Sequence, residues 1–264
     1  HCITSDRSNW DLSHVRIIYN GAEPISSEFF NEFISRLSPF GLRSYAMCPV
    51  YGLAEASLAV SISGLTDEVI SIEVNRDHLK IGDVIQSANS GSPNAVSFVN
   101  DGRPVNYCSV RVTDARNVPV GDGTVGQVEI KGENVTSGYY NNPSETEKIL
   151  RDDGWLNTGD LGFMSGGALY VTGRAKDIIF INGQNYYPHD LESIAQRAPG
   201  LELGKVVAAG VQRPGEQVEQ LMDAPNEAGK EHPCGVVVVA RGAKRAAVRL
   251  DAQIRVGGDA GASE

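Results

Sequence analysis

The sequence has no long apolar run. None of its hydrophobic stretches approaches the about 18 residues that a transmembrane helix requires, so we expect no transmembrane segment. The first residues, HCITSDRSNW, have no charged segment followed by an apolar one, and so do not form a secretion signal. They also include no initiator methionine, and we therefore expect the chain to be a fragment of a longer protein.

Basic side chains are also scarce. Lysine and arginine number 23 against 33 aspartates and glutamates, which gives a net charge of −10. A nucleic-acid surface needs clustered basic residues to neutralise phosphates, so we expect no nucleic-acid partner. The single basic cluster, Arg241–Arg249, is mixed with alanine and glycine and is interpreted as a solvated segment.

Cysteines are few and far apart, and they form no pattern that binds zinc. The spacing contains no Cys-x-x-Cys pair and no Cys/His ligand set, so we expect neither a structural zinc site nor a disulfide framework. Cys48 has no histidine near it in sequence, so a buried thiol is favoured over a nucleophile. Such thiols suit a reducing cytoplasm. The cysteines are Cys2, Cys48, Cys108 and Cys234.

The composition is that of a globular protein. Apolar residues make up 41% and charged residues 21% of the 264 positions. This length allows one large domain or two modest ones, with enough residues for a substantial core.

The N-terminal part reads as alternating strand and helix. Residues 15–19 (VRIIY) and 42–46 (LRSYA) predict short strands. Between them Ser26 or Ser27 caps a predicted helix that ends at Pro39 and Gly41. An aromatic and aliphatic stripe follows this helix at helical spacing, and a core stripe is favoured over the lining of a fatty-acyl tunnel. The stripe consists of Phe29, Phe30, Phe33 and Leu37.

From residue 96 onward the pattern becomes rich in strands. Turns containing glycine or proline separate apolar stretches at 97–99, 107–114 and 126–132. The capping box Ser144–Glu147 predicts a short helix over 144–150.

The C-terminal part continues this alternation and then loses it. Residues 188–197 predict a helix that begins at proline, and 205–211 predict a strand with continuous apolar content, buried on both faces. After Met222 the sequence is heavy in alanine and glycine, although 236–240 (VVVVA) still suits one strand.

The most informative stretch is residues 155–192, WLNTGDLGFMSGGALYVTGRAKDIIFINGQNYYPHDLE. It places Asp160 and Arg174 on neighbouring glycine-containing turns. A carboxylate accepts hydrogen bonds from vicinal ribose hydroxyls, and a guanidinium donates to sugar or phosphate oxygens. The two side chains therefore indicate a site for a polyhydroxylated, phosphorylated ligand.

The order TGD, GR-x-KD and G-x-N-xx-P resembles the crossover between the large and small domains of the adenylate-forming enzymes. Upstream, Tyr51-Gly52-Leu53-Ala54-Glu55 resembles the motif in which an aromatic ring stacks on adenine and a glutamate holds magnesium. Asn20-Gly21-Ala22-Glu23-Pro24 resembles the turn that walls the other face of the adenine. Each motif is weak alone, and their order and spacing carry the resemblance.

The resemblance implies a role for each matching residue. Asp160 binds the ribose hydroxyls, Arg174 reaches ribose or phosphate, and Tyr51 with Gly52 binds adenine. The backbone of Gly21, Ala22 and Glu23 lies close to the base, because small side chains permit a close approach. Glu55 ligates magnesium, for which a carboxylate and phosphate oxygens are suitable ligands. Lys176 is the hinge of a small-domain rotation, with a solvated surface lysine as the alternative, and Gly183 and Asn185 face an incoming phosphopantetheine thiol.

A finer resemblance is to the fatty acyl-AMP ligases. Three features carry it: GLAEASL at residues 52–58, a long insert at about 66–98, and the stretch 185–192 (NYYPHDLE), which matches the pattern NxYPxDIE. The sequence departs from the pattern at Asn100-Asp101, where Ser-Cys or a similar small pair is expected before Gly-Arg-Pro.

The implied fold is α/β with a β-rich subdomain. Residues 1–173 are expected to be the C-terminal part of the large adenylate-forming domain. Residues 174–177 are the expected hinge, 178–222 the start of the small α+β domain, and 223–264 a divergent tail.

The implied function is activation of a fatty acid by ATP, with Mg²⁺, to an acyl-AMP. The acyl group would then pass to an acyl carrier protein with phosphopantetheine, in lipid, polyketide or nonribosomal peptide biosynthesis. The family's upstream phosphate loop and downstream catalytic lysine are not in the sequence, so we expect the chain alone to be inactive. The alternatives are an acyl-CoA ligase using coenzyme A, and a non-catalytic fragment that binds nucleotide or a carrier protein.

Overall fold

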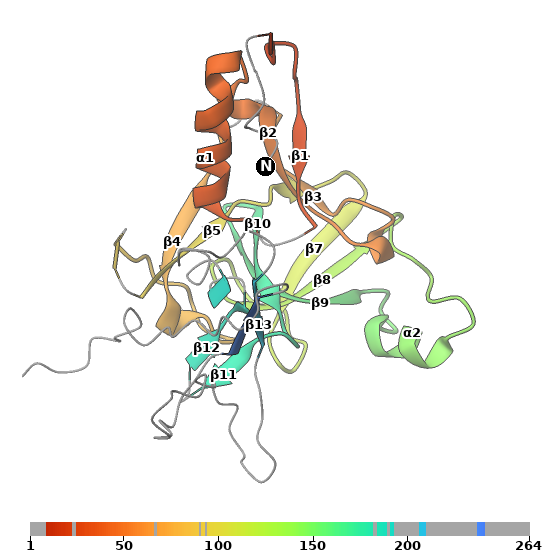
Figure 1. Cartoon of the computed structure of the whole chain (residues 1–264). Coiled ribbons are helices and arrows are strands. Elements are labelled where there is room, and N and C mark those ends of the chain that lie inside the picture. Colours follow the sequence, from red (N-terminus) through yellow and green to blue (C-terminus); the bar gives the residue numbers. More distant parts are fainter. Residues whose placement is uncertain are drawn as a thin grey trace, which may run out of the picture.

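A computed structural model gives the fold of the chain (Figure 1). None of the helices in the described part of the chain is both long and apolar enough to cross a membrane. The structure describes residues 9–22, 25–65, 68–89, 91–92, 94–181, 184–188, 191–192, 206–209 and 237–240.

The first helix, α1 (Ser27–Leu37), forms as predicted. The Ser26 side chain caps it by accepting a hydrogen bond from the Phe29 amide, and Gly41 ends the following turn at a φ of 88°. Phe30 is buried, and Phe33 packs on a cluster around Leu37, Leu42 and Ala46. Phe30, Phe33 and Leu37 therefore face the core, as the favoured interpretation predicted, whereas Phe29 is exposed.

The strand predicted at 42–46 is wrong in position. Residues Ser44–Ala46 form a 3₁₀ turn, and the strand is β2 (Met47–Tyr51). The apolar stretch that the strand buries begins at Ala46 and continues through Met47 and Cys48, so the exposed Arg43 and Ser44 precede it. Cys48 is buried as a free thiol, which agrees with its predicted role.

Strand β2 belongs to a four-stranded sheet in the order β1-β2-β3-β6. Strands β1 and β2 are parallel, and the remaining pairs are antiparallel. Because parallel strands end at the same edge, the turn that follows β1 lies beside the turn that follows β2. The other members are β1 (Ile18–Asn20), β3 (Ser61–Ile62) and β6 (Arg103–Pro104).

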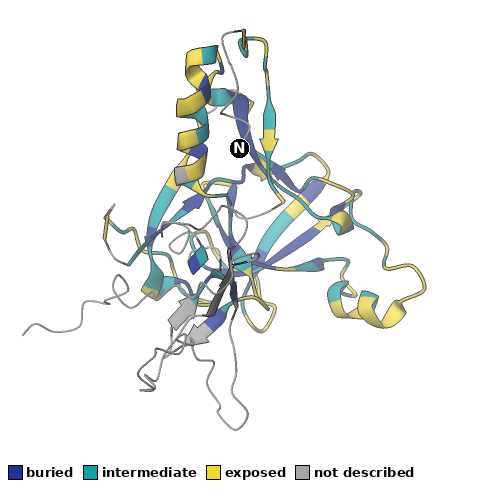
Figure 2. Ribbon diagram, in the orientation of Figure 1, coloured by how far each residue is buried: buried dark blue, intermediate teal, exposed yellow. Residues whose placement is uncertain are grey.

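A second four-stranded sheet, in the order β10-β9-β8-β7, is entirely antiparallel and confirms the predicted β-rich part. Its inner face is buried, as the dark ribbons of Figure 2 show. Alternating apolar residues such as Val128 and Ile130 form that face. Its strands are β7 (Cys108–Thr113), β8 (Gly126–Gly132), β9 (Leu156–Ser165) and β10 (Ala168–Arg174).

The second helix, α2 (Pro143–Ile149), confirms the predicted helix but not its cap. Asn142 accepts the hydrogen bond from the Glu145 amide, and Pro143 occupies the first turn. Since proline favours the first helical position, the cap is Asn142, two residues earlier than Ser144. The helix lies at the periphery of the molecule in Figure 1.

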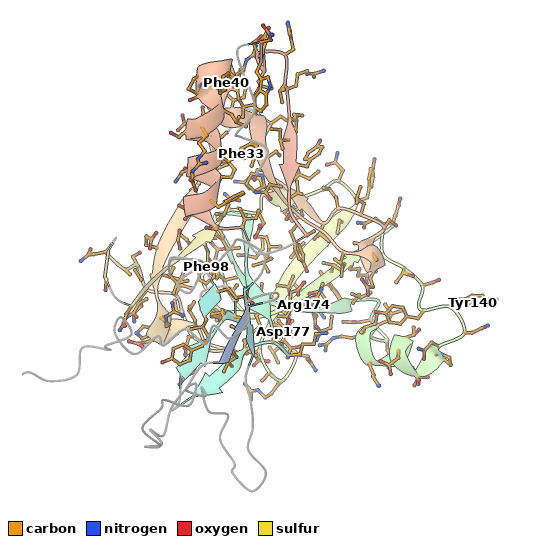
Figure 3. All side chains as sticks on the ribbon, viewed as in Figure 1. Phe33, Phe40, Phe98, Tyr140, Arg174 and Asp177 are labelled. Atoms are coloured by element: carbon orange, nitrogen blue, oxygen red, sulfur yellow. The ribbon has the colours of Figure 1, made fainter. Side chains whose placement is uncertain are left out.

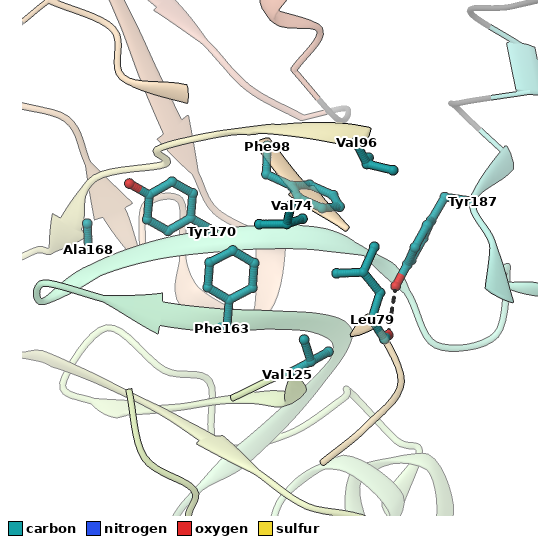
Figure 4. Close-up of a cluster of buried hydrophobic side chains, with 9 residues drawn as sticks. All are labelled: Val74, Leu79, Val96, Phe98, Val125, Phe163, Ala168, Tyr170 and Tyr187. Atoms are coloured by element: carbon teal, nitrogen blue, oxygen red, sulfur yellow. Dashed lines mark hydrogen bonds between the residues drawn. The ribbon is translucent and has the colours of Figure 1, made fainter. Parts of the chain in front are cut away.

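The insert predicted at about 66–98 contains the antiparallel pair β4 (Ser71–Asn75) and β5 (Ala95–Val99). Its apolar side chains pack against the second sheet around Phe163 in one buried cluster (Figure 4). Edge-to-face rings join Phe98 to Phe163 and to Tyr187. The insert is therefore built into the core of the described chain. The cluster comprises Val74, Leu79, Val96, Phe98, Val125, Phe163, Ala168, Tyr170 and Tyr187.

Beyond residue 178 the structure describes two small antiparallel pairs. The strand expected at 205–211 forms over Val206–Ala209, and the one suggested at 236–240 forms over Val237–Ala240 and pairs with it. The helix predicted over 188–197 begins at Pro188 and continues at 191–192, and its remainder lies outside the described residues. The strands are β11 (Ile179–Ile181), β12 (Gln184–Tyr186), β13 (Val206–Ala209) and β14 (Val237–Ala240).

Candidate nucleotide site

The candidate site is built on two irregularities in the pairing of β9 with its neighbours β8 and β10. The first lies on its β8 side, where the register shifts and residues 158–160 leave the ladder. Thr158 fixes this turn, because its Oγ1 donates to the Val128 carbonyl at 2.9 Å and accepts from the Asp160 amide at 3.1 Å. Gly159 has a φ of 78°, which favours glycine. The Thr-Gly-Asp sequence thus turns Asp160 out of the regular sheet.

The second irregularity is a β-bulge in β10. Val171 pairs with Gly162 and Gly173 pairs with Leu161, so Thr172 is an extra residue on this strand. After the bulge Arg174 lies directly opposite Asp160. Cross-strand partners project from the same face, and the Arg174 Nε atom lies 3.3 Å from the Asp160 Oδ1 atom. The predicted carboxylate and guanidinium do meet.

Tyr51 reaches the same carboxylate from the end of β2. Its hydroxyl donates to the Asp160 Oδ2 atom at 2.5 Å. Burial raises the pKa of Asp160 above its ordinary value, and the contacts with Tyr51 and Arg174 oppose that shift. Burial, together with the nearby negative Asp160, raises the pKa of Tyr51 well above its ordinary value. Tyr51 therefore remains a neutral hydrogen-bond donor to Asp160.

The turn after β1 lies beside Tyr51, as the parallel pairing requires. A β-carbon on Gly21 would be 2.5 Å from the Val50 carbonyl oxygen, so glycine lets this turn approach β2 closely. Ala22 has a φ of 73°. Glu23 lies outside the described residues. The structure thus brings Gly21 and Ala22 to the edge of the sheet that carries Tyr51.

Glu55 lies in a 3₁₀ turn, Ala54–Ala56, just after Tyr51 and Gly52. Gly52 permits this turn because a β-carbon there would be 1.9 Å from the Leu58 carbonyl oxygen. The Tyr139 hydroxyl donates to the Glu55 Oε1 atom at 2.5 Å, and this contact raises the pKa of Tyr139 to about 12. Tyr139 belongs to none of the recognised motifs, and no spacing in the sequence links it to Glu55.

The described residues contain no cluster of three or more metal-ligating side chains. Glu55 therefore offers a single carboxylate. That donor set fits Mg²⁺ only where phosphate oxygens and water complete the coordination, which is how Mg²⁺ is usually bound beside nucleotides.

The expected hinge is a hydrogen-bonded turn at the exit of β10. The Ala175 amide donates to the Gly159 carbonyl at 3.0 Å, and the Asp177 amide donates to the Arg174 carbonyl at 3.1 Å. Figure 3 shows Arg174 and Asp177 near the middle of the molecule, and the charge of Asp177 contributes to the raised pKa of Asp160. Lys176 is exposed on this turn.

Of the two residues expected to face the phosphopantetheine thiol, the structure describes one. Asn185 lies in β12 opposite Phe180, and Gly183 lies outside the described residues. The short pair β11–β12 follows the turn at 174–177, so Asn185 is presented on a hairpin beyond the expected hinge.

Motif analysis gave no role to Asp101, yet it is one of the few buried charged residues of the described chain. Its Oδ2 atom accepts from the Val171 amide at 2.9 Å, at the β10 bulge. Burial raises the pKa of Asp101 to about 7, which the hydrogen bond from Val171 partly offsets. Its departure from the Ser-Cys pattern was the one signal in the sequence that pointed to it.

Comparison with known proteins gives a consistent family. The profile of the family described as "AMP-binding enzyme" matches residues 2–140, just over half of the chain. The long-chain-fatty-acid–AMP ligase FadD32 of Mycolicibacterium smegmatis is 37% identical over 220 residues, covering 76% of this chain and 35% of FadD32. A putative acyl-CoA synthetase of Caulobacter vibrioides is 37% identical over 225 residues, covering 82% of this chain and 38% of that protein.

The fold is similar to that of solved relatives. A chain from structural and functional studies of fatty acyl-adenylate ligases from E. coli and L. pneumophila superimposes with a TM-score of 0.70 at 35% identity. The match covers 76% of this chain and 36% of that one. This chain therefore spans little more than a third of the length of these relatives, and its mixed sheets with few helices are those of part of the adenylate-forming fold. The chain belongs to the AMP-binding enzyme family.

Proposed function

We propose that this chain carries the adenylate-binding side of an enzyme that activates a fatty acid to an acyl-AMP. The observation that carries the proposal is the buried carboxylate of Asp160, held by the Tyr51 hydroxyl and the Arg174 guanidinium. Each carboxylate oxygen has two lone pairs, so Asp160 can accept from both ribose hydroxyls while it keeps these contacts.

The other site residues take roles around that carboxylate. The backbone at Gly21 and Ala22 and the ring of Tyr51 form a wall for adenine, because the two turns lie at one edge of the first sheet. Arg174 is 58% exposed, so its guanidinium can turn from Asp160 toward a ribose or phosphate oxygen. Charge-assisted hydrogen bonds of this kind hold the α-phosphate in position.

The proposed reaction has two halves. The fatty-acid carboxylate attacks the α-phosphorus of ATP and displaces pyrophosphate, which gives the acyl-adenylate. A thiolate then attacks the acyl carbonyl and displaces AMP. The residues of this chain contribute by positioning the nucleotide and by placing positive charge beside the α-phosphate. When bound, Mg²⁺ held by Glu55 supplies charge neutralisation at the phosphates.

We infer that the acceptor is the phosphopantetheine thiol of a carrier protein. The inference rests on the insert, which packs into the same cluster as Tyr187 of the segment beyond the expected hinge at Lys176. The Tyr187 hydroxyl also donates to the Leu79 carbonyl at 3.2 Å. These contacts restrain rotation of the segment, and productive closure over coenzyme A is then disfavoured.

The alternative acceptor is coenzyme A, for an acyl-CoA ligase with the same first half-reaction. The resemblance of the chain to a protein named as an acyl-CoA synthetase keeps this alternative open. The further alternative is a non-catalytic fragment that binds nucleotide or a carrier protein. It stays open because the chain spans only 35% of the length of FadD32. Buried free thiols at Cys48 and Cys108 suit an enzyme of the reducing cytoplasm.

The full-length protein should catalyse pyrophosphate exchange into ATP that depends on a fatty acid and on Mg²⁺. A matched series of acids, from short to long chains, defines the substrate class, and benzoate serves as a non-fatty control. In a second assay the acyl-adenylate is offered phosphopantetheinylated carrier protein or coenzyme A at equal concentration. Transfer to coenzyme A alone would replace the carrier-protein proposal, and the absence of any exchange would sink the enzyme proposal.

A further inference from the structure

The turn between β5 and β6 holds a buried carboxyl group that the proposed reaction does not use. Asp101 is only 7% exposed. A carboxyl group is costly to bury unless it is hydrogen-bonded, so its contacts indicate its role.

Those contacts attach the turn to the outer edge of β10. The Asp101 amide donates to the Leu169 carbonyl and the Leu169 amide donates to the Gly102 carbonyl, each at 2.9 Å. The Asp101 Oδ2 atom then accepts from the Val171 amide at 2.9 Å. The Ser61 hydroxyl, itself buried, donates to the Asp101 carbonyl at 2.8 Å and fixes the turn from behind. The backbone of the turn thus pairs with Leu169 as a neighbouring strand would, and the Asp101 side chain adds one more hydrogen bond, to Val171, along the same edge.

That step falls at the bulge. β10 is the outer strand of its sheet, and Val171 is the last residue in register before the shift. The Val171 amide would have no strand to pair with on the outer side among the described residues. The Asp101 carboxyl group accepts from this outward-facing amide immediately before the bulge.

The bulge decides which residue faces Asp160. Before it, Val171 pairs with Gly162, and after it, Arg174 pairs with Asp160. Had the first register continued through Thr172 with no bulge, Gly173 would lie opposite Asp160, and Arg174 would lie one position away. A shift of one residue turns every following side chain to the other face of the strand. The arginine–aspartate pair therefore depends on the bulge.

We propose that Asp101 is a positioning residue for adenylate binding: its carboxyl oxygen holds the Val171 amide so that the bulge forms and Arg174 faces Asp160. Asp101 acts through β10 and Arg174. The inference rests on the proposed function, since Asp160 and Arg174 are proposed there as adenylate ligands.

The test uses the full-length protein and AMP as the probe. Asp101→Asn keeps an oxygen that can accept from Val171, whereas Asp101→Leu has a similar shape and no acceptor. Asp122→Ala is the matched control, because the Asp122 Oδ2 atom accepts from the Gly166 amide at 2.9 Å, at the other end of the β9–β10 hairpin. If the leucine variant does not fold, Asp101→Ala removes the same acceptor without adding volume.

We expect Asp101→Leu to weaken AMP binding about tenfold in calorimetry, the order expected from losing one well-placed hydrogen bond to the ligand. Asp101→Asn should stay within about twofold of the wild type, and Asp122→Ala should not change the affinity. In an Arg174→Ala background, Asp101→Leu should produce no further loss, because both changes remove the same contact.

Two results separate the failure of this inference from the failure of the proposed function. If Arg174→Ala weakens AMP binding but Asp101→Leu does not, or if the two losses add, the inference is overturned while the nucleotide site remains. If the wild type binds no AMP, the proposed function is overturned, and the inference falls with it. Protection of the Val171 amide from hydrogen exchange should also fall in Asp101→Leu and persist in Asp101→Asn and Asp122→Ala.

Discussion

Tyr187 lies so close to Gly173 that a β-carbon on residue 173 would be 2.9 Å from the Tyr187 Cδ1 atom. The contact joins the end of β10 to the segment beyond the expected hinge. Tyr187 is fully buried in this position, and its hydroxyl donates to Leu79 of the insert. One ring therefore connects three parts of the chain that are far apart in sequence.

Gly173→Ala should destabilise the protein. Gly173 has a φ of 147°, a conformation that L side chains rarely adopt, and the added methyl group would press on the Tyr187 ring. Together these effects should lower the free energy of unfolding by about 2–4 kcal/mol. Denaturant unfolding of the full-length protein measures this. Gly121→Ala, with no atom near its β-carbon, is the control and should change stability by less than about 0.5 kcal/mol. Equal stability of the two variants would contradict the contact.

Asp160→Ala should abolish adenylate binding in the full-length protein. The change removes the acceptor proposed for both ribose hydroxyls and leaves the Tyr51 hydroxyl and Arg174 without their shared partner. The loss should be about 2–3 kcal/mol, or on the order of a hundredfold in affinity. Calorimetry with a non-hydrolysable acyl-adenylate mimic measures it. Unchanged affinity would remove Asp160 from the site.

Lys176→Pro should separate the two half-reactions. Proline fixes φ near about −65° and restricts the residue before it, so the turn between Arg174 and Asp177 loses freedom to rotate. Pyrophosphate exchange and acyl transfer should then fall by different factors. Lys176→Ala is the control that removes the charge alone. An equal effect of proline on both rates, or none on either, would show that position 176 is not the hinge.

Tyr187→Phe should loosen the restraint that the insert places on the segment beyond the hinge. It removes only the hydroxyl that donates to the Leu79 carbonyl and keeps the buried ring. Deletion of residues 68–96 is a blunter test, because it would also remove Val74, Leu79 and Val96 from the core. In Tyr187→Phe we expect acyl-adenylate formation to persist and acyl-CoA production to rise. Tyr186→Phe, on the neighbouring residue, is the control. If acyl-CoA production stays at the wild-type level, the Tyr187–Leu79 contact does not enforce acceptor choice.

Asp101 should make stability depend on pH. Burial raises the pKa of Asp101 to about 7 in the folded protein, against 3.8 for an ordinary aspartate. Between those values the folded state holds a proton that the unfolded state has released, so the free energy of unfolding falls as pH rises from about 4 to about 7. The groups that face Asp101 are Tyr51 and Tyr170, whose raised pKa values leave both neutral over this range.

Asp101→Asn should lose this contribution because an amide does not titrate. Denaturant unfolding at pH 5 and pH 8 measures how much the free energy of unfolding changes between these two pH values. This change should be a few kcal/mol smaller in the variant than in the wild type. A wild type and a variant with the same pH dependence would show that Asp101 does not titrate in this range.

The sequence predicted the proximity of Asp160 and Arg174 better than it predicted the residues that support them. Asp160 and Arg174 were recognised from the glycine-containing turns around them, and the structure brings them together. Tyr139 and Asp101 were missed because their partners, Glu55 and Val171, lie 84 and 70 residues away along the chain. Such contacts depend on tertiary packing, which no local spacing encodes.

In the fold, too, the elements with local signals were predicted and the features that depend on tertiary packing were not. The helix α1 was predicted because its cap and its apolar stripe are local signals. The strand expected at 42–46 was misplaced because propensity alone did not indicate where burial begins, and β2 starts at Met47. The insert was recognised as an addition to the family pattern, but its share in the core around Phe163 required the structure.

Because β10 carries a bulge, the β9–β10 hairpin should tolerate length changes at its tip better than changes near the end of β10. Residues added or removed at the tip, around Gly166 and Gly167, leave the pairing of both strands intact, so natural variants can differ in length there. Addition of a single residue between Gly173 and Arg174 would instead move the arginine one position past Asp160 and reverse the face on which it emerges. Related sequences that keep an arginine at this position should therefore conserve the number of residues between it and the Thr-Gly-Asp turn more strictly on the β10 side of the tip than at the tip itself.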